Sequence, residues 1–288
     1  MIDFLGRKYL LVIASVVLLS IAPAAYFLGY GLKYHIDFTG GTEVRLSFGD
    51  VQDISNVRSA VKSSGFDDAV IQQVGSTGKG FLVTLGETSP GVSQDLVSGL
   101  SARLNASPVV DGVELVGAGA GKEVRNNAFF AILLTMLVLL FYIAFRRTFA
   151  YGVGAVVALL HDLVLLFGFL MVAQIPFSLH ILAAVLALLG YSLNDTVVIF
   201  AQIRENAQNL KLKNESAYNI VKISLNEVLR RTLLTSFSTF LALVPLIFLG
   251  TEAVSHFALT MAVAVVIGTY SSVFVASPVM LAIGDNKL

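Results

Sequence analysis

The stretch ILAAVLALLGYSLNDTVVIFAQI, residues 181–203, decides the fold class of this chain. It is long enough to cross the hydrocarbon core of a bilayer, which takes about 20 helical residues, and it carries a single carboxylate, Asp195. A charged side chain at mid-bilayer costs on the order of 2.5 to 3.5 kcal/mol on insertion scales, so such residues usually have a function. Asp195 is therefore the first candidate for a functional residue.

The composition of the whole chain is that of a membrane protein. Its 288 residues are 56% hydrophobic and 13% charged, with more apolar surface than a soluble core of this size can bury. Because 19 Lys and Arg balance 19 Asp and Glu, net charge gives no reason to expect nucleic acid as a partner. The lack of cysteine excludes disulfides, thiolate nucleophiles and cysteine-ligated metal centres.

Further apolar runs of spanning length lie on both sides of residues 181–203. Together they predict six transmembrane helices, at 9–32, 128–145, 149–172, 181–203, 233–249 and 257–283. The first run follows Arg7 and Lys8 and resembles a cleaved signal peptide, but its uninterrupted length favours a retained anchor. The predicted fold class is thus a polytopic α-helical membrane protein.

Basic residues set the predicted orientation, because positive charge resists translocation across the membrane. Arg7–Lys8 precedes the first span, and Arg146–Arg147 joins the second span to the third. The segment after the fourth span carries six more basic residues: Arg204, Lys211, Lys213, Lys222, Arg230 and Arg231. The loops 174–180 and 251–256 contain no Lys or Arg. Both termini are therefore predicted to lie in the cytoplasm.

The segment between the first two spans has the pattern of a small α+β domain outside the cytoplasm. Strands are predicted at 43–48, 69–74, 81–85 and 113–116. Asp50 is expected to cap a helix that runs to residue 64, and Ser89–Pro90 to start a second helix ending near Asn105. The order strand, helix, strand, strand, helix, strand predicts a ferredoxin-like domain.

These elements divide the chain into five parts. They are a cytoplasmic N-terminus with transmembrane helix 1 (1–32), the extracytoplasmic domain (33–125), helices 2 to 4 (126–203), a cytoplasmic amphipathic segment (204–232), and helices 5 and 6 with a cytoplasmic C-terminus (233–288). Within the fourth part, residues 216–229 gather apolar side chains on one face, which predicts an interfacial helix leading into the fifth span.

Ionisable residues in the third and fourth spans predict a polar site inside the membrane. His161 and Asp162 lie in the third span, where residues at helical spacing would let another helix approach closely: Gly154, Ala158, His161, Leu165 and Gly168. Four residues of the fourth span are expected to share one face: Tyr191, Asn194, Asp195 and Val198.

The fifth span offers a partner surface for Asp195. It carries polarity inward along one stripe, made of Arg231, Thr235, Ser238, Thr239 and Ala242. A carboxylate kept from water can take up a proton at neutral pH, so Asp195 is predicted to act as a switch. If the three helices pack together, the predicted proton relay consists of Asp195, Arg231, Asp162, His161, Asn194 and Thr235.

Simpler interpretations of the same residues stay open. Arg230 and Arg231 also suit the cytoplasmic membrane surface, where basic side chains snorkel and set topology. His161 also suits hydrogen-bonded packing, and Asp195 also suits a structural link between helices. The other histidines lack the spacing of metal ligands and are predicted to have no functional role: His35, His180 and His256.

Motifs for cofactors and enzymatic chemistry are missing or incomplete. The run 117–122 looks like a phosphate loop, but Val116 stands where the first glycine belongs and Glu123 replaces Ser or Thr. A flexible return to the membrane is predicted there instead. Since the chain also has no H-E-x-x-H or G-x-S-x-G motif, we expect no metal, no cofactor and no enzymatic activity.

These features resemble the SecF family of protein translocase subunits, within the RND superfamily, over nearly the full length of the chain. The resemblance rests on five motifs: Asp37-Phe38-Thr39-Gly40-Gly41, His161-Asp162, Gly190-Tyr191-Ser192-Leu193-Asn194-Asp195-Thr196-Val197-Val198, Ile203-Arg204-Glu205-Asn206 and Arg231-Thr232-Leu233. The third of these is long and distinctive. One departure is Ala201–Gln202, where family members usually have Asp-Arg, so no role of those charges carries over.

The resemblance implies a half-RND plan of six helices that pairs with SecD as a pseudo-symmetric half. It implies residence in the bacterial cytoplasmic (inner) membrane near the SecYEG channel, with YajC as a further candidate partner. It also implies that the proton motive force helps to draw unfolded preproteins across that membrane. The family's polar membrane residues match Asp195 and Arg231. With no second six-helix copy in the chain, a separate subunit is expected rather than a fused SecDF.

Three other functions remain as alternatives. An RND-type proton-coupled exporter of small molecules or lipids would need a deep apolar pocket in the outer domain. An intramembrane aspartyl protease would use Asp162 and Asp195, but the chain lacks the G-x-G-D run. A passive assembly factor would have no proton traffic at all.

Overall fold

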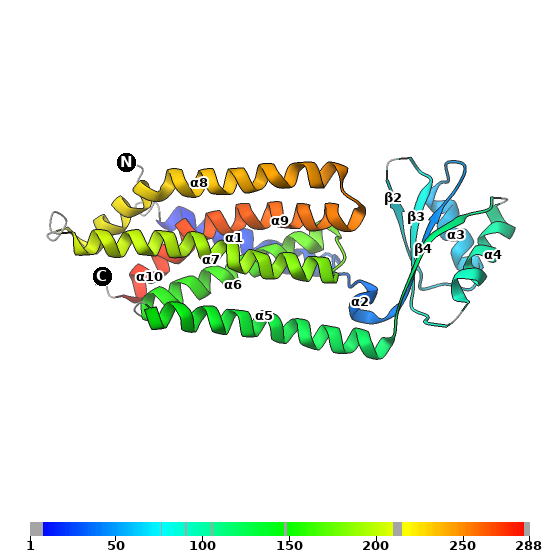
Figure 1. Ribbon diagram of the computed structural model, residues 1–288, viewed down its shortest axis with the longest axis horizontal. Helices are drawn as coiled ribbons and strands as arrows, with labels where there is room; N and C mark the ends of the chain where they lie inside the picture. The colour runs from blue at the N-terminus through cyan, green and yellow to red at the C-terminus, as the bar shows by residue number, and fades with distance from the viewer. Residues whose placement is uncertain are drawn as a thin grey trace. The chain divides into compact units, whose positions relative to one another are not determined.

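The computed structural model describes residues 8–75, 77–89, 91–104, 106–146, 149–209 and 215–284. The chain forms two compact units (Figure 1). The helical unit is made of Met1–Lys33 and Phe130–Leu288, and the sheet unit of Tyr34–Phe129. Some residues used in the predictions above lie outside the described residues: Arg7, Pro90, Asn105, Arg147, Lys211 and Lys213.

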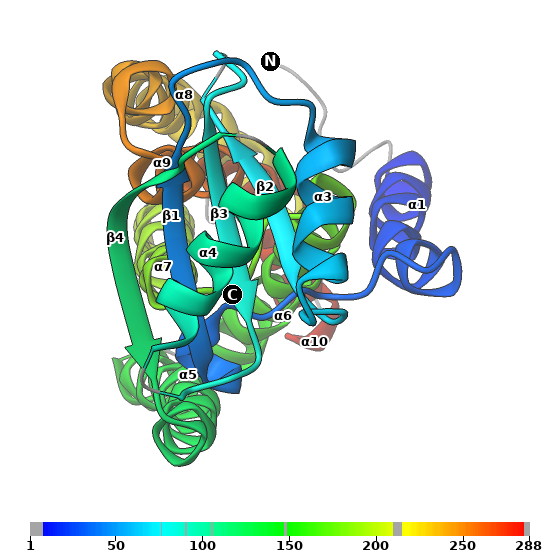
Figure 2. The ribbon, with the colours of Figure 1, turned by 90° about the vertical axis from the view of Figure 1, so that its right-hand side faces the viewer.

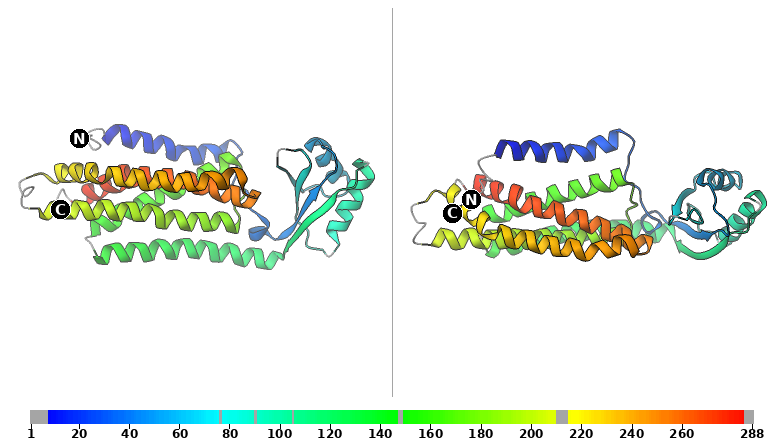
Figure 3. Two further views of the ribbon diagram at one scale, coloured as in Figure 1. Left: turned by 45° about the horizontal axis from the view of Figure 1, so that its top comes forward. Right: turned by 90° about the horizontal axis from the view of Figure 1, so that it is seen from above.

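Long apolar helices make up the helical unit. They are α1 (Lys8–Phe27), α5 (Ala118–Arg146), which begins in the sheet unit, α6 (Phe149–Ala173), α7 (Leu179–Gln208), α8 (Ala217–Leu249) and α9 (Glu252–Ser271). Helix α9 packs against α6, α7 and α8, and Figure 3 shows these helices side by side.

Five helical stretches among the described residues are long and apolar enough to cross a membrane. They are Ala118–Ile143, Phe149–Ala173, Leu179–Gln208, Ala217–Leu249 and Glu252–Ile283. Helix α1 contributes a shorter apolar stretch, Ile13–Phe27. The polytopic helical class is therefore confirmed with five such helices, and the sixth span stays a prediction.

Small residues of α6 allow two neighbouring helices to come close. A Cβ atom at Gly154 would lie 2.7 Å from the carbonyl oxygen of Ala276, and a Cβ at Gly168 would lie 3.0 Å from Cβ of Ala22 in α1. The first of these contacts would force the neighbour to shift, and the second would require it to give by a few tenths of an ångström. The stripe of small residues on α6 thus faces two different parts of the bundle.

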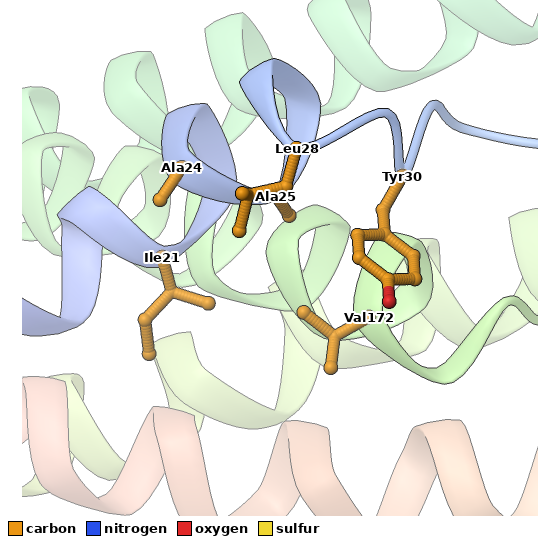
Figure 4. A pocket seen from close by; sticks show the side chains of 6 residues that line it. All are labelled: Ile21, Ala24, Ala25, Leu28, Tyr30 and Val172. Carbon is orange, nitrogen blue, oxygen red and sulfur yellow. The ribbon is translucent and has the colours of Figure 1, made fainter.

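Helix α1 leaves two apolar hollows beside α6. One has a volume of about 360 Å³ and is lined by Ile21, Ala24, Ala25, Leu28, Tyr30 and Val172 (Figure 4). The other, of about 420 Å³, lies between α1, α6 and α9 and is lined mainly by aliphatic and aromatic side chains. Both suit hydrocarbon better than a polar substrate, which needs placed hydrogen-bonding groups.

The C-terminal end of α9 changes its winding. A π-helical turn, η2 (Ser272–Ala276), connects α9 to α10 (Ser277–Ile283), and Pro278 lies in the first turn of α10. Proline has no N–H to donate, and its ring clashes with the carbonyl four residues earlier, so the regular α-helical ladder loses a hydrogen bond there. Widening to a π-turn accommodates Pro278 without breaking the helix.

The sheet unit holds one antiparallel sheet covered on one face. Its strands are β1 (Gly41–Ser47), β2 (Val70–Val74), β3 (Gly80–Leu85) and β4 (Val109–Val116), in the order β2-β3-β1-β4. Two helices, α3 (Ile54–Ser63) and α4 (Val92–Leu104), lie over the same face (Figure 2). Alternate side chains of β1 and β3 point into this core, among them Val44, Leu46, Phe81 and Val83.

Two predicted helix starts in the sheet unit are wrong. Helix α3 is capped by Asp53, whose Oδ1 accepts the backbone N–H of Ser55 at 2.7 Å, and not by Asp50. Asp53, and not Asp50, is the cap because it lies immediately before the first helical residue, where its side chain reaches the free backbone N–H groups. Helix α4 begins at Val92, after Gly91 with φ of 96°. Ser89 therefore precedes the helix without being its cap.

Two segments predicted to lie outside the spans are parts of long helices. Residues 118–122, predicted as a flexible return, form the first turns of α5. The predicted interfacial helix at 216–229 continues without a break into the fifth span, because α8 runs from Ala217 to Leu249 with Ser216 as its N-cap. Local polarity hid the first turns of α5, since they consist of residues that also suit a loop, whereas the helix at 216–229 was predicted and only its continuity with the span was not.

His35 lies between two carboxylates in the sheet unit. Its Nδ1 is 3.0 Å from Oδ2 of Asp37, in the short helix α2 (Ile36–Thr39), and its Nε2 is 2.9 Å from Oε2 of Glu43 in β1. Burial disfavours the charged ring, but hydrogen bonding to the two carboxylates and their negative charges outweighs it and raises the pKa of His35 to about 10. The ring is therefore a cation at neutral pH.

We expect this ion-pair cluster to make stability depend on pH. Because the pKa of His35 rises from 6.5 to about 10 on folding, its contribution is complete below pH 6.5 and is lost as pH rises through about 10. Thermal unfolding of the detergent-solubilised chain at stepped pH checks this. The melting temperature of His35→Gln should fall less over that range than that of the wild type, and equal falls would contradict the assignment.

Candidate functional site

Asp162 is the centre of a buried polar cluster in the helical unit. Its side chain is fully buried in α6, and Oδ2 accepts hydrogen bonds from Ser192 of α7 at 2.6 Å and from Ser271 of α9 at 2.8 Å. Its Oδ1 lies 3.3 Å from Nδ1 of His161. One carboxylate thus joins three helices, and its desolvation is compensated by these hydroxyl donors.

Close backbone packing brings the donors of this cluster together. A Cβ at Gly268 of α9 would lie 3.0 Å from Cβ of Ser192, so only glycine lets α9 approach α7 this closely without displacing that serine. Ser271 is the last residue of α9, immediately before the π-turn. Such turns are frequent at functional sites because they re-aim side chains within a helix.

Asp195 lies one helical turn after Ser192 and is also buried, at 4% exposure. Its Oδ2 has no hydrogen-bond partner among the described residues. Arg231 and Ser236 of α8 are the charged and polar neighbours of this carboxylate. The predicted pairing of the fourth and fifth spans around Asp195 thus has a geometric counterpart in α7 and α8.

A chain of hydroxyl groups passes through Ser236. Tyr191 donates to Oγ of Ser236 at 3.2 Å, and Oγ of Ser236 lies 2.6 Å from Oγ1 of Thr269 in α9. The hydroxyl of Thr269 donates a hydrogen bond to the carbonyl oxygen of Val265 at 2.7 Å. Ser236 has a single proton to donate, and its neighbours include two acceptors, the Thr269 hydroxyl at 2.6 Å and the Asp195 carboxylate.

Three predicted relay residues lie at the surface of this chain. Asn194, Arg231 and Thr235 are exposed, and Asn194 does not share the buried face of Asp195. The hydroxyl of Thr235 bonds to its own helix, at 3.1 Å from the carbonyl of Arg231, which removes it from any direct path to Asp195. His161 is buried, stacks on the ring of Tyr270 and leaves Nε2 without a hydrogen-bond partner among the described residues.

The family-motif residues divide between the two units. Tyr191 and Ser192 belong to the hydrogen-bonded groups above, whereas a Cβ at Gly190 would meet no atom within 4 Å, so this chain alone shows no steric need for glycine there. Asp37, Gly40 and Gly41 lie in the sheet unit. Sequence reasoning missed Ser236, Thr269 and Ser271, although hydroxyls in apolar spans are a usable signal.

A second polar cluster ties α7 to α8 beyond Asp195. The side-chain amide of Gln202 donates to Oε2 of Glu227 at 3.0 Å, and that of Asn206 donates to the same oxygen at 2.6 Å and to Ser224 at 3.0 Å. We call these four residues the Gln202 cluster. Gln202 stands at one of the two positions where the sequence departs from the pattern of the family that it resembles, and here an amide side chain meets the carboxylate.

Replacing Gln202 with Arg is expected to stabilise the contact between α7 and α8. A guanidinium would pair with the Glu227 carboxylate, and because Gln202 is only partly buried the gain is about 0.2–1 kcal/mol. Thermal unfolding of the solubilised chain should show a small rise in melting temperature. The double variant Gln202→Arg with Glu227→Gln is the control, and a similar rise there would contradict the ion-pair explanation.

No group of three or more His, Asp or Glu residues in the described part of the chain could hold a metal ion. The polar clusters combine carboxylates, hydroxyls and one guanidinium in apolar surroundings. Carboxylates and hydroxyls of this kind can bind, pass and release protons. The arrangement is thus suited to moving charge between helices.

Comparison with known proteins agrees with this architecture. The family described as "Protein export membrane protein SecD/SecF, C-terminal" matches residues 98–286. The protein translocase subunit SecF of Thermodesulfovibrio yellowstonii is 36% identical over 100% of this chain and 96% of its own length, and that of Pseudomonas aeruginosa is 35% identical over 97% and 90%.

Two solved structures are also similar. The crystal structure of SecDF from Thermus thermophilus, described as a translocon-associated membrane protein, matches with a TM-score of 0.88 and 34% identity over 99% of this chain. A structure of SecDF in a super-membrane-facing form matches with a TM-score of 0.71 and 33% identity. This chain spans 39% of the length of each of those chains.

Proposed function

Because the chain belongs to the SecF family of protein translocase subunits, we propose that it works with SecD to drive preproteins across the bacterial cytoplasmic membrane by means of the proton motive force. Membership supports the role in Sec translocation and the partnership with SecD. The observation that carries proton coupling is Asp195, a buried carboxylate on a membrane helix beside Arg231 and Ser236.

Protonation of Asp195 is the proposed switch. The ionised carboxylate attracts Arg231 and accepts a hydrogen bond from the hydroxyl of Ser236. The protonated carboxyl loses its attraction for the guanidinium and releases Ser236, whose hydroxyl then turns to Thr269 of α9. Each proton thus exchanges a contact between α7 and α8 for one between α8 and α9, and this exchange is a local change that helix packing can amplify.

A second membrane subunit is proposed to cover the polar surface around Asn194 and Arg231. Exposed polar and charged groups on membrane helices are costly against lipid, and a protein partner can satisfy them. SecD is the partner that family membership supports. We further propose contact with the SecYEG channel, with YajC and with unfolded preprotein, and a role without enzymatic chemistry.

The arrangement in the membrane is part of the proposal. We propose that α1 is the sixth span, that both termini lie in the cytoplasm and that the sheet unit lies outside. The loops rich in Lys and Arg support this orientation, and the strand order β2-β3-β1-β4 with two covering helices supports a ferredoxin-like sheet unit.

An exporter of small molecules or lipids is the alternative. It would need a deep apolar pocket in the sheet unit, but a hollow of about 630 Å³ there is open and is lined largely by polar side chains such as Gln52, Asp53 and Asn56. This observation favours the translocase over the exporter.

The proposed function is tested by reconstitution. Vesicles that contain the channel, the translocation ATPase and SecD, with or without this chain, are loaded with a preprotein and given a proton gradient. We expect the gradient to speed the appearance of protease-protected or released preprotein only when the chain is present. Equal gradient effects with and without it would overturn the proposal.

A further inference from the structure

Two family-motif residues that the proton relay does not use lie near the points where the chain enters and leaves the sheet unit. Asp37 and Gly40 lie on the entering segment, and Gly121 lies in the first turns of α5, the departing helix. Together with His35 and Glu43 they form a cluster within the sheet unit that we call the neck. Its contacts are ionic on one side and steric on the other.

The ionic side of the neck ties the entering segment to the central strand. His35 pairs with Asp37 on one ring nitrogen and with Glu43 of β1 on the other, at 3.0 and 2.9 Å. Glu43 is 6% exposed, so its carboxylate depends on this cation for compensation. Removing the charge of His35 would take this cation away from both carboxylates.

The steric side of the neck ties the entering segment to α5. Gly40 has a φ of 77°, and a Cβ there would lie 2.6 Å from Cα of Ala118. A Cβ at Gly121 would lie 2.6 Å from the backbone nitrogen of Gly40. The two backbones are thus in direct contact, and neither glycine can be replaced without displacing backbone atoms.

Helix α5 itself has no feature that would let it bend after the neck. It runs from Ala118 to Arg146 as one α-helix, with no proline and with its last glycine at position 121. Its first part, as far as Phe129, belongs to the sheet unit. Helices kink chiefly at proline, glycine or π-turns, so the rest of α5 is expected to behave as a rod.

We propose that the neck locks the first turns of α5 to strand β1, so that α5 carries motion between the membrane helices and the sheet unit. His35, Gly40 and Gly121 are then positioning residues for the coupling. The existence of the lock rests on the contacts above, whereas its use in coupling rests on the proposed function.

The lock is tested by distance measurements within the sheet unit. The chain lacks cysteine, so Arg58→Cys on α3 and Asn126→Cys on α5, both exposed, accept two spin labels without background. Pulsed electron resonance on the full chain in lipid nanodiscs should give a narrow distance distribution. With Gly121→Ala we expect a distance distribution about twice as broad or a second population, because the added Cβ would push the backbone of α5 away from that of Gly40.

Matched variants separate the lock from general effects of substitution. Gly119→Ala lies in the same turns of α5, but its Cβ would meet no atom within 4 Å, so it should leave the distribution narrow. His35→Gln should broaden it, whereas His35→Arg, which keeps the cation, should restore it, and His180→Gln at an exposed histidine should have no effect. If Gly121→Ala does not fold, the comparison of His35→Gln with His35→Arg decides.

Equal widths for Gly121→Ala and Gly119→Ala, or for His35→Gln and His35→Arg, would overturn the lock whatever the translocation assay shows. The reconstituted assay is the second readout, in which folded Gly121→Ala should lose most of the gradient effect and Gly119→Ala should keep it. Broadening together with an unchanged gradient effect would overturn the coupling role. If wild type shows no gradient effect, the proposed function fails, while the distance result still decides the lock.

Discussion

Replacing Asp195 with Asn is expected to abolish the effect of a proton gradient on preprotein release while the chain stays folded. Asn has the same shape and can still bond to Ser236, but it cannot alternate between charged and neutral forms. One charge moved through 100 mV yields about 2.3 kcal/mol, which shifts an equilibrium by a factor of roughly 50. That free energy is what the variant loses.

The measurement is the rate of preprotein release from reconstituted vesicles, with the gradient present and after its collapse by an ionophore. Preprotein release by the wild type should slow when the gradient is collapsed. Release by Asp195→Asn should have that lower rate both with and without the gradient. Thr235→Val is the control, because among the described residues its hydroxyl bonds to the carbonyls of its own helix, at residues 231 and 232. If Asp195→Asn still responds to the gradient as wild type does, the switch lies elsewhere.

Replacing Asp162 with Ala is expected to have its main effect on stability. The variant leaves the buried hydroxyls of Ser192 and Ser271 without their shared acceptor, and an unsatisfied buried polar group costs on the order of 1–3 kcal/mol. It also removes the neighbour of His161. The helical unit should therefore unfold at a lower temperature or denaturant concentration than that of the wild type.

Unfolding of the purified chain in mild detergent, followed by circular dichroism, checks this expectation. Asp162→Asn keeps an acceptor oxygen of the same reach and should lose much less stability than Asp162→Ala. Ser192→Ala removes one donor only and should fall between them. Equal stability of wild type and Asp162→Ala would show that the cluster does not hold the three helices together.

The sequence pattern was enough to place the carboxylates of the site. Asp162 and Asp195 stand out because a carboxylate in an apolar run has few structural explanations. The partners of these residues were harder to predict. Ser236 and Ser271 contact them only because of the rotation of α8 and α9 about their axes, which side-chain periodicity in a uniformly apolar helix does not define.

Helix geometry and tertiary packing explain why Asn194 and the glycines of α5 lie where the sequence pattern did not place them. Asn194 lies beside Asp195 in sequence, but a helix turns by 100° per residue and carries it to the surface of the chain. The glycines at 119 and 121 looked like a flexible loop because the chain that packs on Gly121 comes from Gly40, far away in sequence. Glycine favours a loop only where nothing else requires a small residue.

Helix α8 is longer than a membrane is thick. Its 33 residues rise about 50 Å at 1.5 Å each, whereas the hydrocarbon core is about 30 Å, so roughly 20 Å of the helix stands clear of the lipid tails. The Gln202 cluster holds this overhang to the end of α7. A pivot of about 10° within the bilayer would swing a tip 20 Å away by some 3.5 Å, roughly two residues of helical rise. A change at Asp195 that tilts α8 would therefore displace the part of α8 that lies outside the bilayer. The end of α7, which the Gln202 cluster joins to it, would move with it.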